Sequence, residues 1–222
     1  MRATKRLLYL LPLLAFLALP TTAESQVAIG VSGGLSLANF SGDDVDDDEF
    51  DSRTGLLAGG FINVPISEIL SVTSGLYYVQ KGASDAEAGE DGTFKVDYVE
   101  VPVLLQVGVG QTESAAFSVF AGPRLGFETK CQVEGADDGV TAAVDCDSPA
   151  LADALGFELE TKGVTFGAIF GAGVRVMTSE TMFFVANGGL DLGLQSFVDI
   201  EDVDIKNNAW FLQAGVGWIV GG

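Results

Sequence analysis

The stretch Asp97–Val107 reads Asp-Tyr-Val-Glu-Val-Pro-Val-Leu-Leu-Gln-Val and decides the fold class. Every second residue from Val99 to Val107 is apolar, and the residues between them include Tyr98 and Glu100. A period of two is that of a β-strand, whose successive side chains point to opposite faces. The alternation therefore predicts a strand with one wholly apolar face and one mixed face. The rest of the chain has to decide which face meets water.

Eight segments of the chain share this alternation. They cover residues 26–40, 55–65, 69–81, 93–107, 114–127, 163–177, 181–197 and 208–220. Their connections alternate between long ones (41–54, 82–92, 128–162 and 198–207) and short ones (66–68, 108–113 and 178–180). This layout predicts an all-β fold, an eight-stranded antiparallel up-and-down barrel. Its long loops lie at one end, and its tight turns and both termini lie at the other.

The placement of charge indicates that the barrel spans a membrane. Of the 31 Asp and Glu residues, 24 fall in the four long connections, and the strands are left almost free of them. The strand face opposite the apolar one is rich in Gly, Ser, Thr and Ala, which suits the narrow interior of an eight-stranded barrel. A soluble lipocalin-like carrier, the least favoured alternative, would instead carry charge on its outer face. We therefore predict that the valines of the opening stretch face lipid and that Glu100 faces the lumen.

Aromatic residues near the strand ends fit the interfacial girdles of a membrane barrel. Those expected on the long-loop side are Phe40, Phe127, Phe197 and Trp210, and Trp218 is expected nearer the turns.

The first 23 residues resemble a secretory signal, so the expected domains are a signal peptide (1–23) and a barrel domain (24–222). Arg2, Lys5 and Arg6 precede an apolar run that ends near Leu19, and small residues precede a cleavage point after Ala23. Removing this segment leaves eight Lys and Arg against 31 acids, a net charge near −23. Such a chain is a poor partner for nucleic acid or anionic surfaces.

The two cysteines, Cys131 and Cys146, lie in the same polar connection. In an exported protein such a pair is expected to form a disulfide. Two free thiols or a metal site are the alternatives, and a chain without histidine supplies a zinc site poorly. The same connection contains a short predicted helix at residues 149–157.

Four segments resemble the outer-membrane β-barrel domain proteins that are called porin-family or PorT-like in Bacteroidetes-type bacteria. They are Ser74–Gly82, Tyr98–Leu105, Gly122–Gly126 and Gly167–Val176, and they follow a Gly-rich first strand. The resemblance implies an integral protein of the outer membrane of a Gram-negative-type bacterium. The C-terminal sequence departs from the pattern, because it lacks a terminal aromatic residue and Trp218 is the nearest substitute.

Four charged residues fall on the small-residue face of the strands: Glu100, Arg124, Arg175 and Asp191. Two acids and two bases inside a narrow lumen are costly unless they pair. We expect them to form an interior salt-bridge network, together with Tyr98 and Lys81, that plugs the barrel and fixes strand register. The alternative is a path along which ions pass.

The acidic loop after the first strand has Asp44, Asp46 and Asp48 at the spacing that opens an EF-hand. The pattern then fails, because Glu49 stands where glycine is needed and Gly55 stands where the bidentate Glu belongs. A weak rim for divalent cations and a plain solvated acidic surface both stay open.

The sequence predicts no catalytic residue and no cofactor. Without histidine, the Ser-His-Asp and Cys-His arrangements are impossible, and no Gly-rich segment continues as a phosphate-binding loop. The expected function is that of a monomeric structural or surface-interaction barrel with a plugged lumen. Its partners are outer-membrane lipid and, at the acidic loops, divalent cations or a surface partner. A small porin or channel is the runner-up.

Overall fold

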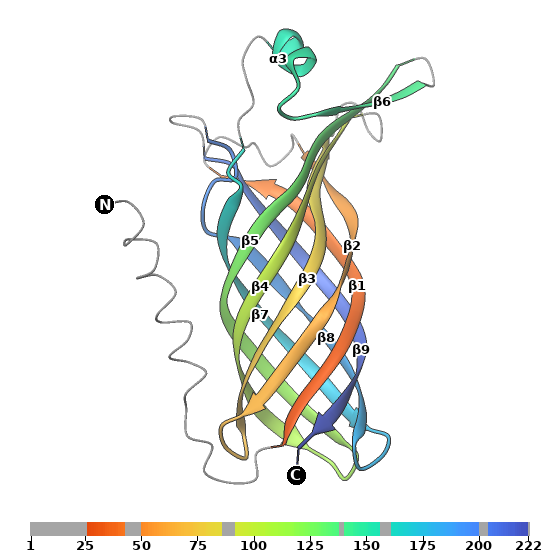
Figure 1. Ribbon diagram of the computed structural model, residues 1–222, viewed down its shortest axis with the longest axis vertical. Coiled ribbons are helices and arrows are strands. Elements are labelled where there is room, and N and C mark those ends of the chain that lie inside the picture. The colour runs from red at the N-terminus through yellow and green to blue at the C-terminus, as the bar shows by residue number, and fades with distance from the viewer. Residues whose placement is uncertain are drawn as a thin grey trace, which may run out of the picture.

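The computed structural model describes residues 26–42, 50–85, 92–137, 140–155, 161–199 and 204–221. Eight long strands form the barrel wall (Figure 1). They are β1 (Val27–Ser41), β2 (Phe50–Pro65), β3 (Leu70–Asp85), β4 (Gly92–Gln111), β5 (Ala115–Asp137), β7 (Val164–Met177), β8 (Met182–Gly193) and β9 (Lys206–Val220). The predicted signal peptide, residues 1–23, lies outside the described residues.

The strands pair as an antiparallel sheet that closes on itself. The order round the wall is β4-β3-β2-β1-β9-β8-β7-β5, and pairing of β4 with β5 completes the circle. The first and last strands are neighbours, with Val27 opposite Val220, so both ends of the barrel chain lie beside the short turns. The eight-stranded up-and-down barrel predicted from the sequence is therefore confirmed. We call the end with the short turns the periplasmic end and the other the extracellular end.

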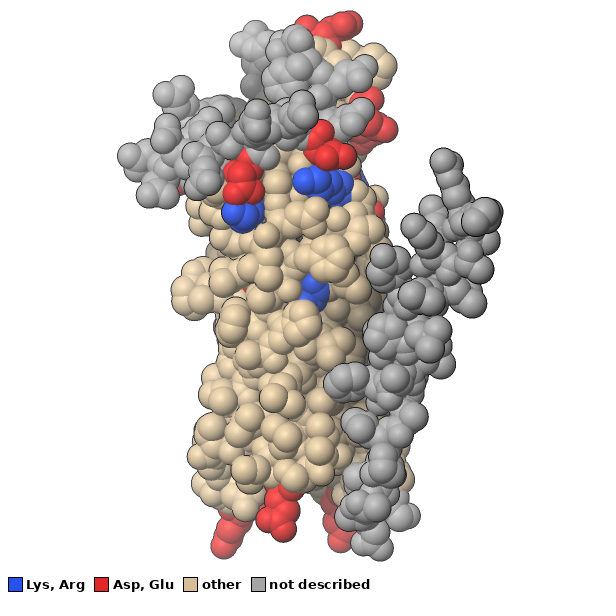
Figure 2. Space-filling view, turned by 90° about the vertical axis from the view of Figure 1, so that its left-hand side faces the viewer, with Lys and Arg blue, Asp and Glu red and all other residues tan. Residues whose placement is uncertain are grey.

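The alternation of side chains places apolar residues on the outside of the wall. Large aliphatic and aromatic side chains are exposed on every barrel strand, among them Val31, Leu56, Leu105 and Phe170. Figure 2 shows the result, a middle band almost free of charge between acidic ends. Glu100 alternates along β4 with valines that face outward, so its side chain points into the lumen. It is buried there, with 2% of its surface exposed. Among the described residues, no helix is long and apolar enough to cross a membrane.

The extracellular end contains more regular structure than the sequence analysis predicted. Strand β5 continues to Asp137 and pairs with a ninth strand, β6 (Val140–Asp145), which lies outside the barrel. The helix α3 (Pro149–Leu155) follows, at the place where a short helix was predicted. We call this projection, residues 128–137 and 140–155, the extracellular arm (Figure 1). Strand β8, in contrast, ends at Gly193 rather than near residue 197.

Two of the predicted girdle aromatics are not on the outside. Phe40 and Phe197 are 7% and 4% exposed, and their rings stack inside the barrel with centroids 5.1 Å apart. The girdle prediction is wrong for them because Phe40 lies on the inward face of β1, and the segment after β8 turns back to bury Phe197. Trp210 and Trp218, which are 62% and 42% exposed, do face outward, as does Phe127.

A small hydrophobic core lies at the extracellular end of the lumen. We call it the aromatic cap, and its buried members are Phe40, Ala83, Val96, Tyr98, Phe197 and Val198. Phe94 packs at its edge, with its ring centroid 6.0 Å from that of Phe40. Since Val96 and Tyr98 share a face of β4 with Glu100, the cap lies directly on the extracellular side of that carboxylate.

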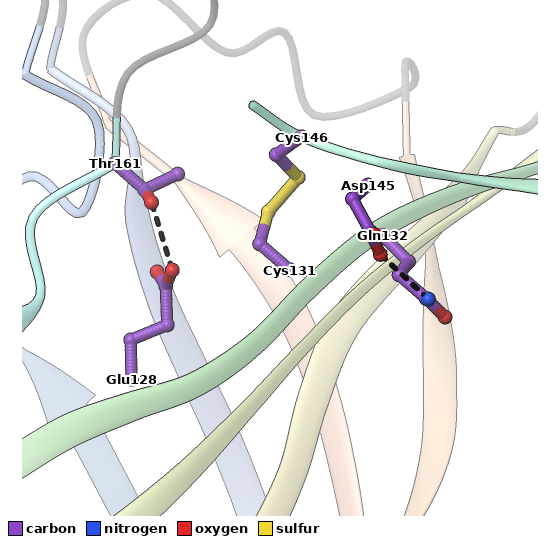
Figure 3. The surroundings of a disulfide bond; sticks show 6 residues. All are labelled: Glu128, Cys131, Gln132, Asp145, Cys146 and Thr161. Atoms are coloured by element: carbon purple, nitrogen blue, oxygen red, sulfur yellow. Dashed lines mark hydrogen bonds between the residues drawn. A yellow bond between two sulfur atoms is a disulfide. The ribbon is translucent and has the colours of Figure 1, made fainter. Parts of the chain in front are cut away.

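A disulfide links two segments of the extracellular arm. Cys131 on β5 and Cys146 after β6 are bonded, with their Cα atoms 5.4 Å apart, as predicted from the sequence (Figure 3). The Gln132 amide donates to Asp145 at 2.7 Å nearby. The Thr161 hydroxyl donates to Glu128 at 2.8 Å, which connects the base of the arm to the start of β7. These contacts all lie beyond the membrane-facing part of the wall.

Replacing both cysteines by serine is expected to loosen the arm and leave the barrel intact. Closing a loop of 15 residues contributes about 3 kcal/mol on the chain-entropy model, and this loop lies outside the barrel strands. Limited proteolysis in detergent should therefore cut the arm of the variant up to about a hundredfold faster. The heat-dependent gel mobility of the barrel should not change. Equal cleavage rates in the two proteins would show that the disulfide does not hold the arm.

Candidate functional site

Four charged side chains meet inside the lumen just below the aromatic cap. Lys81 comes from β3, Glu100 from β4, Arg124 from β5 and Asp191 from β8. All four are almost completely buried, with exposed fractions of 0 to 4%. Each occupies an inward position of the two-residue alternation, which is why the strands bring them to the same interior. We call these four residues the ion cluster.

The geometry of the ion cluster is that of an alternating ring of charges. The Lys81 ammonium lies 2.7 Å from Glu100 Oε1 and 2.5 Å from Asp191 Oδ2. Arg124 Nε donates to Asp191 Oδ1 at 2.6 Å and lies 3.4 Å from Glu100 Oε1. Each acid thus contacts both bases. A further hydrogen bond, 3.2 Å long, runs from Arg124 Nη1 to the Thr165 hydroxyl.

The ion cluster spans the full width of the barrel. Strands β3 and β8 are four positions apart in either direction round the eight-stranded wall, so they lie on opposite sides. The contact between Lys81 and Asp191 therefore crosses the lumen along its diameter. The lumen of an eight-stranded barrel is just wide enough for side chains to fill. The ion cluster therefore lies across the interior of the barrel at this level.

The charges of the ion cluster balance, and this makes their burial tolerable. Moving one ion out of water costs several kcal/mol even after relaxation, and the cost is recovered only by well-formed pairing. Asp191 meets that condition with hydrogen bonds from both Lys81 and Arg124, whereas Glu100 Oε1 is held by ion pairs alone. The Lys81 ammonium also lies 5.9 Å from the centroid of the Tyr98 ring in the aromatic cap. The cluster ties β3, β4, β5 and β8 together in one register.

Three of the four predicted interior charges, Glu100, Arg124 and Asp191, lie in the ion cluster. Lys81, expected only as an additional member, provides the shortest link across the lumen. Arg175 does not belong to it, and the prediction that placed it there is wrong. The two-residue alternation determines the face of the strand on which a side chain lies. It does not determine the level of that side chain along the barrel axis. Arg124 pairs with Gly167, and Arg175 lies eight residues further toward the periplasmic end of β7.

A cavity of about 90 Å³ lies on the periplasmic side of the ion cluster. Lys81, Glu100 and Asp191 contribute to its boundary at one end. Further along the wall its lining includes Asn63, Gln106, Ser118, Asn187 and Arg175. All of these except Asn187 belong to a hydrogen-bonded belt, in which Gln106 donates to Ser118 at 2.7 Å, Asn63 donates to Thr73 at 2.7 Å and Arg175 donates to Asn63. This cavity was not predicted from the sequence, although Asn63, Gln106 and Asn187 occupy inward positions of their strands.

The described part of the chain contains no group of three or more acidic, cysteine or histidine side chains able to hold a metal ion. The suggested cation rim, Asp44, Asp46 and Asp48, lies outside the described residues.

An apolar outer band and a closed antiparallel wall together define a transmembrane β-barrel. The chain belongs to the outer membrane protein beta-barrel domain family, whose sequence model matches residues 20–199. It is an outer-membrane protein. Comparison with curated proteins gives no match.

Solved structures with a similar fold are outer-membrane barrels. Outer membrane protein W of E. coli has a TM-score of 0.50 at 12% identity, with 90% of this chain and 100% of that chain covered. OprG of Pseudomonas aeruginosa gives 0.49 at 15% identity, covering 90% and 98%. Neisserial surface protein A gives 0.48 at 12% identity, covering 87% and 99%. At these identities the likeness concerns the fold alone.

Proposed function

We propose that this protein is a structural or surface-interaction barrel of the outer membrane whose lumen is closed. The observation that carries the proposal is the contact between Lys81 and Asp191 across the barrel diameter, at 2.5 Å. Glu100 and Arg124 complete the ion cluster around it, and the aromatic cap covers it on the extracellular side. An ion entering from either end would have to break buried ion pairs or displace packed aromatic rings.

A small porin or channel is the second candidate. The cavity of about 90 Å³ favours it, because part of the lumen is not filled by side chains. The cavity ends at the ion cluster, however, and the space between Arg124, Tyr98 and Phe197 above it is packed. Since both candidates share the same fold, the distinction depends on the ion cluster alone. A soluble lipocalin-like carrier does not fit the apolar outer wall.

Planar-bilayer recording of the purified full chain distinguishes the closed barrel from the channel. The proposal predicts no unitary current steps from the wild type. The double variant Lys81→Ala/Asp191→Ala removes the cross-lumen contact while keeping the interior charge balanced, and small steps are expected from it if it folds. Regular ohmic steps from the wild type would refute the closed lumen and favour the porin.

We place the interaction role at the acidic extracellular end. The red patches near the arm in Figure 2 belong to this end, and most of the 31 acids fall in the loop connections that meet there. Divalent cations or a basic surface partner are the chemistry that such a surface attracts. Calorimetry with Ca²⁺ at low salt should give binding heat that disappears near physiological ionic strength. No heat at low salt would favour a solvated surface with no cation role.

We also propose the narrower family assignment, the PorT-like proteins of Bacteroidetes-type bacteria, and the absence of catalysis. The first is supported by the four segments from Ser74–Gly82 to Gly167–Val176, and the second by the lack of histidine in the whole sequence. The genes next to this one would test the narrower assignment. A monomer is the expected assembly.

A further inference from the structure

We propose that the periplasmic half of the lumen holds a binding site for a small monovalent anion, with Arg175 as its cation and chloride as its simplest ligand. The charges inside the barrel do not all pair with one another. The two acids and two bases of the ion cluster neutralise one another. Arg175 is the interior charge left over. Among the described residues, no carboxylate lies within 4.0 Å of its guanidinium.

The guanidinium of Arg175 is held in place by uncharged groups. Its Nη2 donates to Asn63 Oδ1 at 3.2 Å, and its Cζ lies 4.4 Å from the centroid of the buried Phe183 ring. The Asn63 amide nitrogen in turn donates to Ser71 and Thr73 at 2.9 and 2.7 Å, which fixes the oxygen toward Arg175. This one hydrogen bond uses one of the five N–H groups of arginine. Within the part of the chain that the structure describes, the guanidinium makes no other hydrogen bond, so its remaining N–H groups can donate to an anion.

The cavity beside Arg175 has the size and lining for such a ligand. Its volume of about 90 Å³ is several times the ~10–15 Å³ that a single water requires, so it has room for a halide ion with accompanying waters. Asn187, Gln106 and Ser118 lie in the same lining. Because Gln106 donates to Ser118 Oγ, the Ser118 hydroxyl hydrogen is free to point elsewhere. A single cation balances a single negative charge, so the site favours a monovalent anion over multiply charged phosphate esters and nucleotides.

The burial of the lumen indicates from which side the anion enters. Arg175, Gln106 and Ser118 are only partly buried, whereas the ion cluster is almost completely inaccessible. An anion therefore arrives from the periplasmic end and stops beneath the ion cluster. At that boundary the side chains of Lys81, Glu100 and Asp191 are held in ion pairs across the lumen, which blocks onward passage. The site is consequently a dead end rather than part of a pore.

Chloride-35 NMR on the full chain in a chloride-free non-ionic detergent, to which NaCl is added, tests the site. Wild type should broaden the chloride line, and bromide, a halide of similar size, should reverse the broadening, while gluconate, a much bulkier carboxylate, should not. Arg175→Gln should lose at least nine-tenths of the bromide-sensitive broadening. Lys206→Met, which removes a cation outside the lumen, should keep it.

Three results would overturn the inference. They are a wild-type line no broader than that of Arg175→Gln, broadening that bromide does not displace, and equal loss in Lys206→Met. Should Arg175→Gln fail to fold, Arg175→Lys takes its place, with weakened but detectable broadening expected. The wild-type bromide displacement stands on its own in that case. Conductance of the wild type does not enter this test, so the closed lumen and the anion site can fail separately.

Discussion

Replacing Arg124 by methionine is expected to destabilise the folded barrel by about 3–5 kcal/mol. The variant leaves Glu100 and Asp191 buried with only the Lys81 ammonium between them, so one negative charge in the lumen is uncompensated. Methionine fills much of the vacated volume, and the loss therefore reports the charge rather than a void. Urea titration in detergent, followed by heat-dependent gel mobility, measures the shift in the unfolding midpoint.

Two further variants make the Arg124 result specific. Lys206→Met removes a cation at the extracellular end of β9, where the side chain is 30% exposed, and should change stability by less than about 1 kcal/mol. Adding Asp191→Asn to Arg124→Met restores an interior with one acid and one base, and should recover part of the loss. An unchanged midpoint in Arg124→Met alone would remove the ion cluster from the account of stability.

Replacing Gly34 by alanine is the second change expected to have a large effect. Strand β1 runs so close to β9 at this point that a Cβ on Gly34 would clash with the Leu212 carbonyl oxygen. The obstacle is backbone, which cannot rotate away as a side chain can. Overpacking of this kind costs roughly 1–3 kcal/mol, and more where the backbone must move.

Gly110 in β4 provides the matched control for Gly34. A Cβ there would meet nothing within 4 Å, and the chemical change from glycine to alanine is the same. The same urea titration should show a lower midpoint for Gly34→Ala and a midpoint at or above wild type for Gly110→Ala. Equal behaviour of the two variants would mean that β1 and β9 are not as close as described.

Much of the barrel could be predicted because its rules are local. A period of two identifies a strand, and the strict order of long and short connections gives the up-and-down topology without any long-range information. The disulfide was predictable for the same reason, since Cys131 and Cys146 lie close together in the sequence. Glu100 could be assigned to the lumen because its neighbours on both sides are valines.

The features that could not be predicted depend on the level of a residue along the barrel axis and on the packing of loops. Arg175 lies on the inward face of its strand, but eight residues below the level of Arg124. The level of a residue along the barrel axis depends on the stagger between strands. Lys81 is followed by a long polar connection, so nothing local marked it as the centre of the ion cluster. Phe197 became a core residue only because the segment after β8 returns over the lumen. Strand β6 has few residues and depends on the extension of β5 for pairing.

The central claim is that the valine face of β4 contacts lipid, and two adjacent leucines test it. Leu105 is 48% exposed on the outer wall, and Leu104 lines the interior cavity. Each is replaced singly by tryptophan in a chain whose own Trp210 and Trp218 are changed to phenylalanine. The measurement is the quenching of tryptophan fluorescence by lipids brominated on their acyl chains. The account predicts strong quenching of Leu105→Trp and little of Leu104→Trp. The reverse would shift β4 by one residue, turn Glu100 toward lipid and contradict the ion cluster.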